Sequence, residues 1–454
     1  MKAKVWRIGL CVLVGMMLLP NIFYGQSYET YEKEAQAHVK KLVDNEMAVG
    51  IVIGILDEKG ERYYSYGKKA VDGDAVDEFS LYEIGSISKT FTGLLYAQEM
   101  VEGNIKLGST LKKLLPYKVR KQTGKVTIEQ IMTHSSGMPR LPSNLGLNKA
   151  DPSNPYAHYT NEDLKAFMQG KAVETRMIGE YSYSNLAMGL AGNILEQRSG
   201  KSFEALVKER ICEPLKMENT CVNLSDGQKE LLAMGHVATE QVSNWDIPTL
   251  AGAGALLSNA SDMLRYLDAH MNPGAGPFAE AVGIGTKDYF TAEGGAVLGL
   301  AWHKKPLSDR QLVTHGGGTG GYRTFAGYDP VGKRAVVVLC NSATNVGDVG
   351  LFLLAPEEHG LSVIVEEVKV DTKVYEGYKG KYELVPGFFI TVTVDGDKLM
   401  AQATGQDAFQ IYPKSETRFF YKVVQAEIEF VKEGDKVTHL ILYQGGEKKA
   451  VKVE

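Results

Sequence analysis

The stretch GSISKTFTGLLYAQEMVEGN, residues 85–104, combines a complete helix signal with a reactive pair of residues at its start. The apolar side chains that recur at helical spacing are Phe91, Leu94, Leu95 and Val101. Gly103-Asn104 is a typical C-terminal stop, so the sequence predicts a helix over residues 86–102. Residues i and i+3 share one face of a helix, so Lys89 can place its amine beside the hydroxyl of Ser86.

The Ser86-x-x-Lys89 pair has a chemical use, because a serine hydroxyl is a weak nucleophile until a neighbouring base takes its proton. Lowering a lysine pKa from about 10.4 to about 7 takes roughly 4–5 kcal/mol of differential interaction, which a semi-buried site can supply. The pattern alone is weak, since Ser109-x-x-Lys112 is a second copy. The alternative interpretation is an ordinary helix start with an exposed lysine.

Strand patterns lie on both sides of this helix. Before it, residues 50–56 and 62–66 predict a hairpin, preceded by a charged amphipathic helix over 28–46. From 105 to about 270 the pattern is helices broken by loops. Later elements are predicted as strands at 298–303, 310–314, 322–328 and 334–339 and a helix near 346–356. This order predicts an α/β (α+β) domain whose antiparallel sheet is assembled from both ends of the chain around an all-helical insert.

The C-terminal part has a different pattern, which begins after a composition shift at about 357–373. Its short alternating segments predict strands at 380–384, 388–394, 398–403, 417–422, 427–431, 437–443 and 450–453. Such a series is typical of a small β-barrel or sandwich, which we expect to form a separate domain. The predicted organisation is a signal peptide over 1–26, a main domain over 27–356, a linker over 357–372 and an all-β accessory domain over 373–454.

Two further segments carry residues suited to chemistry. Tyr183-Ser184-Asn185 opens a predicted helix, where a phenol beside the lysine can relay protons and an asparagine can bind a substrate amide. The second segment is HGGGTGGY, residues 315–322. A strand so rich in glycine pairs poorly unless another backbone approaches it closely, and its amides can donate into an oxyanion hole. Taken singly, the first segment can be an ordinary helix cap and the second a flexible glycine loop.

The order and placement of the three segments match the S-x-x-K, Y-x-N and K/H-T/G-G motifs. On these residues the chain resembles the serine β-lactamase and penicillin-binding protein superfamily, in particular its class C-like branch, over about residues 30–356. THSSGMP at 133–139 and GEYS at 179–182 add to the resemblance. It implies a β-lactamase/transpeptidase-like fold with helices flanking the sheet, and acyl-transfer chemistry that needs no cofactor.

The resemblance also implies roles for the residues at matching motif positions. Ser86 resembles the acylated nucleophile, Lys89 its proton acceptor and Tyr183 the second acid/base. The implied substrate-binding positions are Asn185, His315, Gly317 and Gly318. The oxyanion hole would consist of the backbone N–H groups of Ser86 and Gly318, and loss of one such donor typically costs about 2.7–4 kcal/mol of transition-state stabilisation.

The third motif departs from the class C pattern, because His315 stands where those β-lactamases usually carry lysine. Histidine there is more similar to the DD-peptidase, D-aminopeptidase and esterase relatives. A histidine also changes charge near neutral pH, so we expect binding of a substrate carboxylate to weaken as pH rises. The expected function is a serine hydrolase that acts through an acyl-enzyme on a β-lactam or a D-amino-acid peptide. The alternatives are an esterase or acyltransferase of the same fold, or a penicillin-binding sensor without turnover.

Composition and the N-terminus bear on location and partners. The 454 residues contain 50 Lys and Arg against 55 Asp and Glu, a net charge of −5, which argues against a nucleic-acid binder. The basic start MKAKVWR and the apolar run at 8–19 have the layout of a secretory signal peptide, although the cleavage site is poor. We therefore expect a periplasmic or secreted protein without a membrane span after cleavage; the alternative is an uncleaved anchor. The expected partner is a small-molecule or peptide substrate, and protein partners are not predicted.

Beyond the leader, the cysteines are Cys212, Cys221 and Cys340. An odd number without a C-x-x-C pair excludes a disulfide framework. A Cys212–Cys221 bridge is conceivable in an oxidising compartment, but buried inert thiols are favoured. The nine histidines show no spacing typical of metal ligands, so no metal site is expected.

Overall fold

The computed structural model describes residues 20–146, 151–174, 177–406, 408–422, 424, 426–434 and 436–454, with side chains from Tyr28 onward. Most of the expected signal peptide lies outside the described residues, and the remainder forms the start of α1 (Pro20–Asp44). Among the described helices, none is both long enough and apolar enough to cross a membrane.

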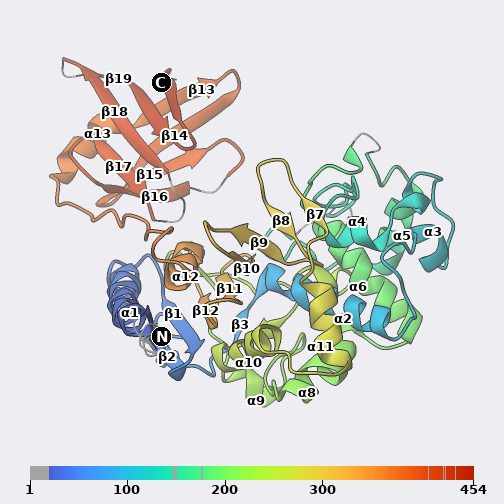
Figure 1. The fold of residues 1–454 in the computed structure, drawn as a ribbon. Helices are drawn as coiled ribbons and strands as arrows, with labels where there is room; N and C mark the ends of the chain where they lie inside the picture. Colours follow the sequence, from blue (N-terminus) through green and yellow to red (C-terminus); the bar gives the residue numbers. More distant parts are fainter. Residues whose placement is uncertain are drawn as a thin grey trace, which may run out of the picture.

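One antiparallel sheet of eight strands organises the main domain, in the order β2-β1-β12-β11-β10-β9-β8-β7. Its strands are β1 (Gly50–Asp57), β2 (Gly60–Gly67), β7 (Phe290–Thr291), β8 (Val297–Leu298), β9 (His303–Pro306), β10 (Gln311–Gly318), β11 (Arg323–Asp329) and β12 (Arg334–Cys340). The N-terminal β1 pairs with the late β12, which confirms that the sheet is assembled from both ends of the chain (Figure 1).

Helices cover both faces of this sheet, and the alternation of side chains along the strands decides which residues meet them. On β12, Ala335, Val337 and Leu339 belong to the core shared with α10 (Ala260–Met271). Val336, Val338 and Cys340 belong to the core shared with α1 and α12 (Gly347–Leu354) on the opposite face. β12 is buried at every position, as a central strand with two covered faces should be.

The insert between β2 and β7 is mainly helical but not all-helical, because it contains two short two-stranded sheets. They are β3 (Tyr82–Glu83) with β6 (Leu257–Ser258) and β4 (His236–Val237) with β5 (Glu240–Gln241). The helices of the insert are α2 (Ser88–Val101), α3 (Leu111–Leu114), α4 (Ile128–Met132), α5 (Asn161–Gln169), α6 (Asn185–Ser199), α7 (Phe203–Val207), α8 (Glu213–Leu215), α9 (Asp226–Lys229), α10 and α11 (Pro277–Gly285). α4 and α5 each begin at a capping box, with Thr127 and Thr160 as the N-cap residues. Gly200 ends α6 in the left-handed conformation, as a C-terminal stop requires.

Two strand predictions differ from the structure. The predicted strand over 298–303 is broken, because Gly299 N–H donates to the carbonyl of Trp302 and Ala301 is left-handed, with a φ of 65°. This turn separates β8 from β9 and buries Trp302 in the core. The strand predicted at 310–314 instead continues as β10 through the glycines to Gly318.

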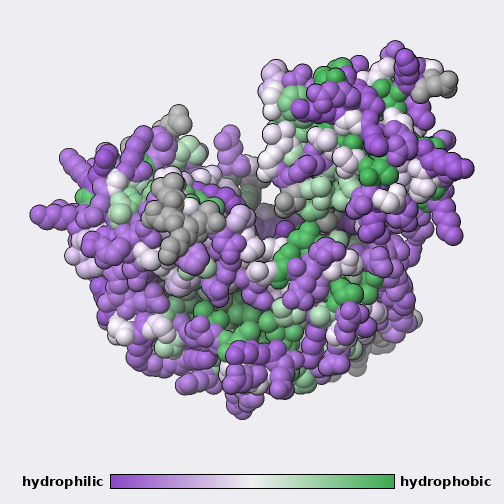
Figure 2. Space-filling view, turned by 180° about the vertical axis from the view of Figure 1, so that it is seen from behind, coloured by the Kyte–Doolittle hydropathy of each residue, from purple (hydrophilic) through white to green (hydrophobic). Residues whose placement is uncertain are grey.

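The C-terminal part is a closed barrel rather than a sandwich, and β13 pairs with β20 to close it. Its strands are β13 (Gly380–Val385), β14 (Phe388–Asp395), β15 (Lys398–Ala403), β16 (Ala408–Pro413), β17 (Arg418–Tyr421), β18 (Glu427–Glu433), β19 (Lys436–Tyr443) and β20 (Glu447–Lys452). The sequence analysis did not predict β16, of which Ile411 and Pro413 alone are fully buried. In the space-filling view the molecule is hollowed between the barrel and the main domain (Figure 2).

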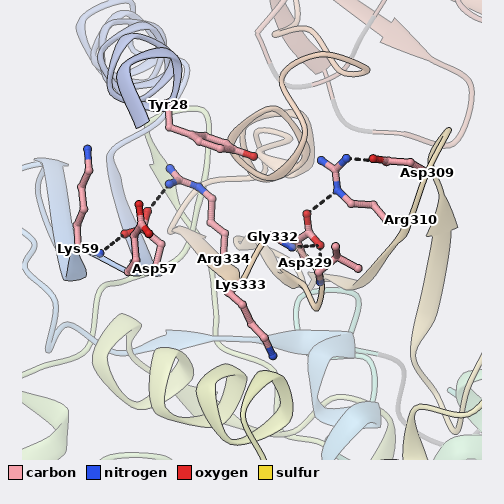
Figure 3. A pocket seen from close by; sticks show the side chains of 11 residues that line it. Tyr28, Asp57, Lys59, Asp309, Arg310, Asp329, Gly332, Lys333 and Arg334 are labelled. Carbon is pink, nitrogen blue, oxygen red and sulfur yellow. Dashed lines mark hydrogen bonds and ion pairs between the residues drawn. The ribbon is translucent and has the colours of Figure 1, made fainter. Parts of the chain in front are cut away.

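A cavity of about 320 Å³ lies where β1, β11 and β12 meet the N-terminal helix (Figure 3). Arg334 bonds Glu32 of α1 at 2.8 Å and also pairs with Asp57, while Arg62 holds the same two carboxylates at 3.0 and 2.7 Å. The ring of Tyr28 lies 4.4 Å from the Arg334 guanidinium carbon. These ion pairs link α1 to the edge of the sheet formed by β1, β2 and β12.

Replacing Arg334 with methionine should lower the free energy of unfolding by about 1–3 kcal/mol, because Arg62 alone then pairs with the buried Glu32 and the half-buried Asp57. Chemical denaturation at neutral pH measures the change. The matched control is Lys59→Met, which removes an exposed cation from the same cavity and should change stability by less than about 0.5 kcal/mol. Equal losses of unfolding free energy in the two variants would show that the ion pairs of Arg334 do not stabilise the fold.

Candidate active site

Ser86 lies in a 3₁₀ turn (Gly85–Ile87) at the start of α2, pressed against the glycine-rich end of β10. A Cβ on Gly317 would lie 2.0 Å from the carbonyl oxygen of Ile84, and one on Gly85 would lie 2.7 Å from the backbone N of Gly318. Gly85 also has a φ of 50°. The glycines are therefore required by close approach of two backbones, as the sequence predicted.

Lys89 follows one helical turn later and is fully buried. Its Nζ lies 2.9 Å from Ser86 Oγ and donates to the carbonyl oxygen of Ala253 at 2.6 Å. Burial, with a smaller contribution from the charge of Arg140, holds the pKa of Lys89 well below its usual value. A larger share of this amine is therefore unprotonated near neutral pH, as a base for Ser86 must be. In the Ser109-x-x-Lys112 copy, the lysine is exposed.

Tyr183 precedes α6, whose N-cap is Ser184. The Lys89 Nζ lies 4.9 Å from the centroid of the Tyr183 ring. Burial raises the pKa of the phenol to about 12, although a hydrogen bond with Ser86 acts in the opposite direction. The phenol thus contacts the Ser86 hydroxyl and keeps its proton at neutral pH. The structure brings together the three residues expected to carry the chemistry.

A small pocket opens over Ser86 and is also lined by Asn185 and Gly318. The Nδ2 of Asn185 donates to the Tyr156 hydroxyl at 3.4 Å, while its buried Oδ1 has no partner among the described residues. Tyr156 and Trp245 form an aromatic wall, with ring centroids 5.5 Å apart. The other lining residues are Gly85, Ile247, Ala253, Gly254 and Thr319. No residue that lines this pocket carries a charge.

His315 lies in a buried position close to the site. Its side chain is buried, Nδ1 lies 2.7 Å from the carbonyl oxygen of Gly316, and the ring packs 4.9 Å from that of His303. Burial, His303 and Lys89 together hold the pKa of His315 well below 6.5. This environment disfavours the charged form of His315 near neutral pH, and its part in substrate binding stays a prediction. His315 is not among the residues that line the small pocket over Ser86.

The sequence analysis missed several residues around the site. His134 lies within the THSSGMP segment and Arg140 directly follows it, but the sequence assigns neither residue a role. The ring of His134 lies 4.3 Å from that of Tyr183, and the guanidinium carbon of Arg140 lies 5.3 Å from the same ring. Trp245 and the Ala253 carbonyl come from loops without a motif. Their positions follow from tertiary contacts alone.

Arg140→Gln should move the acid limb of the kcat/KM profile to higher pH. The Arg140 charge disfavours the ammonium form of Lys89, so its removal raises the pKa of the lysine and less free amine remains at a given pH. The change should be less than about one pH unit, because Arg140 is exposed and screened. Profiles of kcat/KM against pH, recorded at low and at high salt, measure this shift of the acid limb. Arg198→Gln, an exposed charge on α6, should leave the limb in place, and an unchanged limb in Arg140→Gln would contradict the electrostatic argument.

The cysteines are free and buried, so the conceivable Cys212–Cys221 bridge is not formed. Burial raises the pKa of each thiol to about 12, which makes them unreactive. Among the described residues, no group of three or more His, Cys, Asp or Glu side chains is arranged to hold a metal ion.

Comparison with known proteins separates the same two parts of the chain. A family model described as Beta-lactamase matches residues 35–354. A second, described as a domain of unknown function (DUF3471), matches residues 366–452. The first range covers the sheet and its helices with the candidate site, and the second covers the barrel.

Individual relatives are similar over most of their length. A β-lactamase of Pseudomonas fluorescens is 24% identical over 338 residues, which are 67% of this chain and 91% of the relative. Penicillin-binding protein 4* of Bacillus subtilis is 26% identical over 408 residues, 83% of this chain and 88% of the relative.

Solved structures show the fold. The octameric penicillin-binding protein homologue from Pyrococcus abyssi has a TM-score of 0.64 at 24% identity, covering 92% of this chain and 99% of its own. A class C β-lactamase from Rhodobacter sphaeroides has a TM-score of 0.62 at 21% identity, with coverages of 70% and 96%. The predicted fold class is confirmed for both parts of the chain.

Proposed function

The chain belongs to the beta-lactamase family, and on this premise we propose that it is an exported serine hydrolase that cleaves an amide bond through a covalent acyl-enzyme at Ser86. The observation that carries the proposal is the 2.9 Å contact between Ser86 Oγ and the buried amine of Lys89. The export part of the proposal is supported by the leader sequence.

In the proposed reaction, the Ser86 hydroxyl gives its proton to the unprotonated Lys89 amine while Oγ attacks the substrate carbonyl. The backbone N–H groups of Ser86 and Gly318 donate to the developing oxyanion. Tyr183, with its pKa of about 12, donates a proton to the leaving amine and regains one from Lys89. Water then attacks the ester and releases the acid, with the same groups accepting and returning the proton.

The proposed substrates are β-lactams or D-amino-acid peptides. The relatives are named as β-lactamases and as a penicillin-binding protein, which supports this class. The free Oδ1 of Asn185 at the pocket supports an amide-bearing substrate, because it can accept an N–H.

An esterase or acyltransferase of the same fold is the second candidate. The observation that favours it is the absence of charge among the described residues that line the pocket, together with the burial that disfavours a charged His315. A substrate without a carboxylate near the scissile bond suits such a pocket.

Intact-mass spectrometry of the quenched reaction, combined with product counting, tests these proposals. The donors are a penicillin, a D-Ala-D-Ala peptide and an activated ester of a neutral acid. Turnover of the penicillin or the peptide well above one product per protein is the expected result. Turnover of the ester alone would select the second candidate, and one stoichiometric burst that leaves a stable adduct would indicate a sensor. No adduct and no product with any donor would overturn the hydrolase proposal.

A further inference from the structure

His134 occupies an unusual backbone position immediately after α4. Its φ is 55°, in the left-handed region where residues with a β-carbon are strained, and its side chain is completely buried. Most helix ends of this kind use glycine. A bulky ring kept at a strained position suggests that the ring has a use.

Three contacts of His134 surround Tyr183. The carbonyl oxygen of His134 accepts the N–H of Ser182 at 2.7 Å, and its Nδ1 accepts the N–H of Ser184 at 3.2 Å. The imidazole also lies against the Tyr183 ring, at 4.3 Å between centroids. One residue thus holds both chain neighbours of the phenol and one face of its ring.

The contact with Ser184 fixes the state of the imidazole. A nitrogen that accepts a backbone N–H carries no proton, so His134 must be neutral with its proton on Nε2. The groups around the ring are Lys89, Arg140, His303, Tyr181 and Tyr183. Burial and the positive charges among them hold the pKa of His134 well below 6.5, which keeps this acceptor available at neutral pH.

We propose that His134 is a positioning residue that fixes the Tyr183 phenol against Ser86 and Lys89 by accepting the Ser184 N–H and packing on the phenol ring. The expected effect on catalysis rests on the proposed function, whereas the expected effect on the position of the Tyr183 phenol does not. A loosened phenol donates its proton poorly, and a misplacement of about 1 Å can cost on the order of 10²-fold in rate.

The test compares His134→Ala with His134→Asn. Asparagine offers an oxygen close to the place of Nδ1 and tolerates the left-handed conformation, so it should restore most of the activity. Alanine should lower kcat on the order of 10- to 100-fold with little change in KM. The control His270→Asn alters a buried histidine of α10 that bonds Tyr266, and it should keep the wild-type kcat.

A fluorine label reports geometry without relying on activity. With 3-fluorotyrosine at position 183, the ¹⁹F resonance should shift or broaden in His134→Ala and return toward the wild-type signal in His134→Asn. An unchanged resonance in His134→Ala, or equal loss of kcat in the two His134 variants, would overturn the proposal. If the wild type hydrolyses no donor while the resonance still responds, the positioning holds and the proposed function fails.

Discussion

Ser86→Ala should reduce hydrolysis of the preferred donor on the order of 10³- to 10⁶-fold and abolish the covalent adduct. The variant removes the hydroxyl oxygen that both the buried Lys89 amine and the Tyr183 phenol contact. Substrate binding should survive, because the Asn185 amide and the aromatic wall remain. The expected signature is therefore a loss of kcat with a nearly unchanged affinity for the donor.

The matched control for this substitution is Ser109→Ala. Ser109 begins the second S-x-x-K copy, but its Oγ accepts the N–H of Lys106 and its partner Lys112 is exposed. This variant should retain the wild-type kcat/KM and the full amount of adduct. Persistent hydrolysis by Ser86→Ala at more than about one tenth of the wild-type rate would show that another group is the nucleophile.

Gly317→Ala should reduce kcat/KM by on the order of 10²-fold or more, although it adds a single methyl group. The new Cβ would lie 2.0 Å from Ile84 O and 2.2 Å from Thr324 Oγ1, so β10 and the segment before Ser86 must move apart. That movement separates Gly318 from Ser86. The proposed oxyanion hole needs the backbone N–H of each of these residues to point at the same substrate oxygen. Overpacking of this kind also costs about 1–3 kcal/mol of stability.

Gly316→Ala is the matched control, one residue away on the same strand. A Cβ there meets only Thr324 O at 3.7 Å, which is ordinary van der Waals contact. The comparison uses kcat/KM and the thermal midpoint of both variants. If Gly316→Ala and Gly317→Ala lose the same activity, close approach of the two backbones is not what the site requires.

The local parts of this architecture could be predicted from sequence. The β1–β2 hairpin, the capped helices and the Ser86–Lys89 contact follow from periodicities of a few residues. The close packing of the glycine-rich strand could also be inferred, because glycine in a strand otherwise has a cost. The existence of a separate C-terminal β domain followed from its alternating strands.

Features set by tertiary contacts could not be predicted. The sequence does not state how deeply β10 is buried at residue 315, so the burial of the His315 ring against His303 could not be predicted. Arg140 lies over the Tyr183 ring, and its carbonyl accepts the N–H groups of Asn185 and Leu186 at the start of α6, a contact between segments far apart in the sequence. In the barrel, β16 has no strong alternating pattern in its sequence. It forms a strand because it pairs with β15 on one side and β17 on the other.

The most direct test of the account is peptide mapping of the acyl-enzyme. Protein quenched in acid during turnover is digested with trypsin, and the peptide spanning 70–89 is fragmented to place the added mass on Ser80, Ser86 or Ser88. The account predicts the acyl group on Ser86 alone. An acyl group on any other residue, or turnover without a covalent adduct, would contradict it.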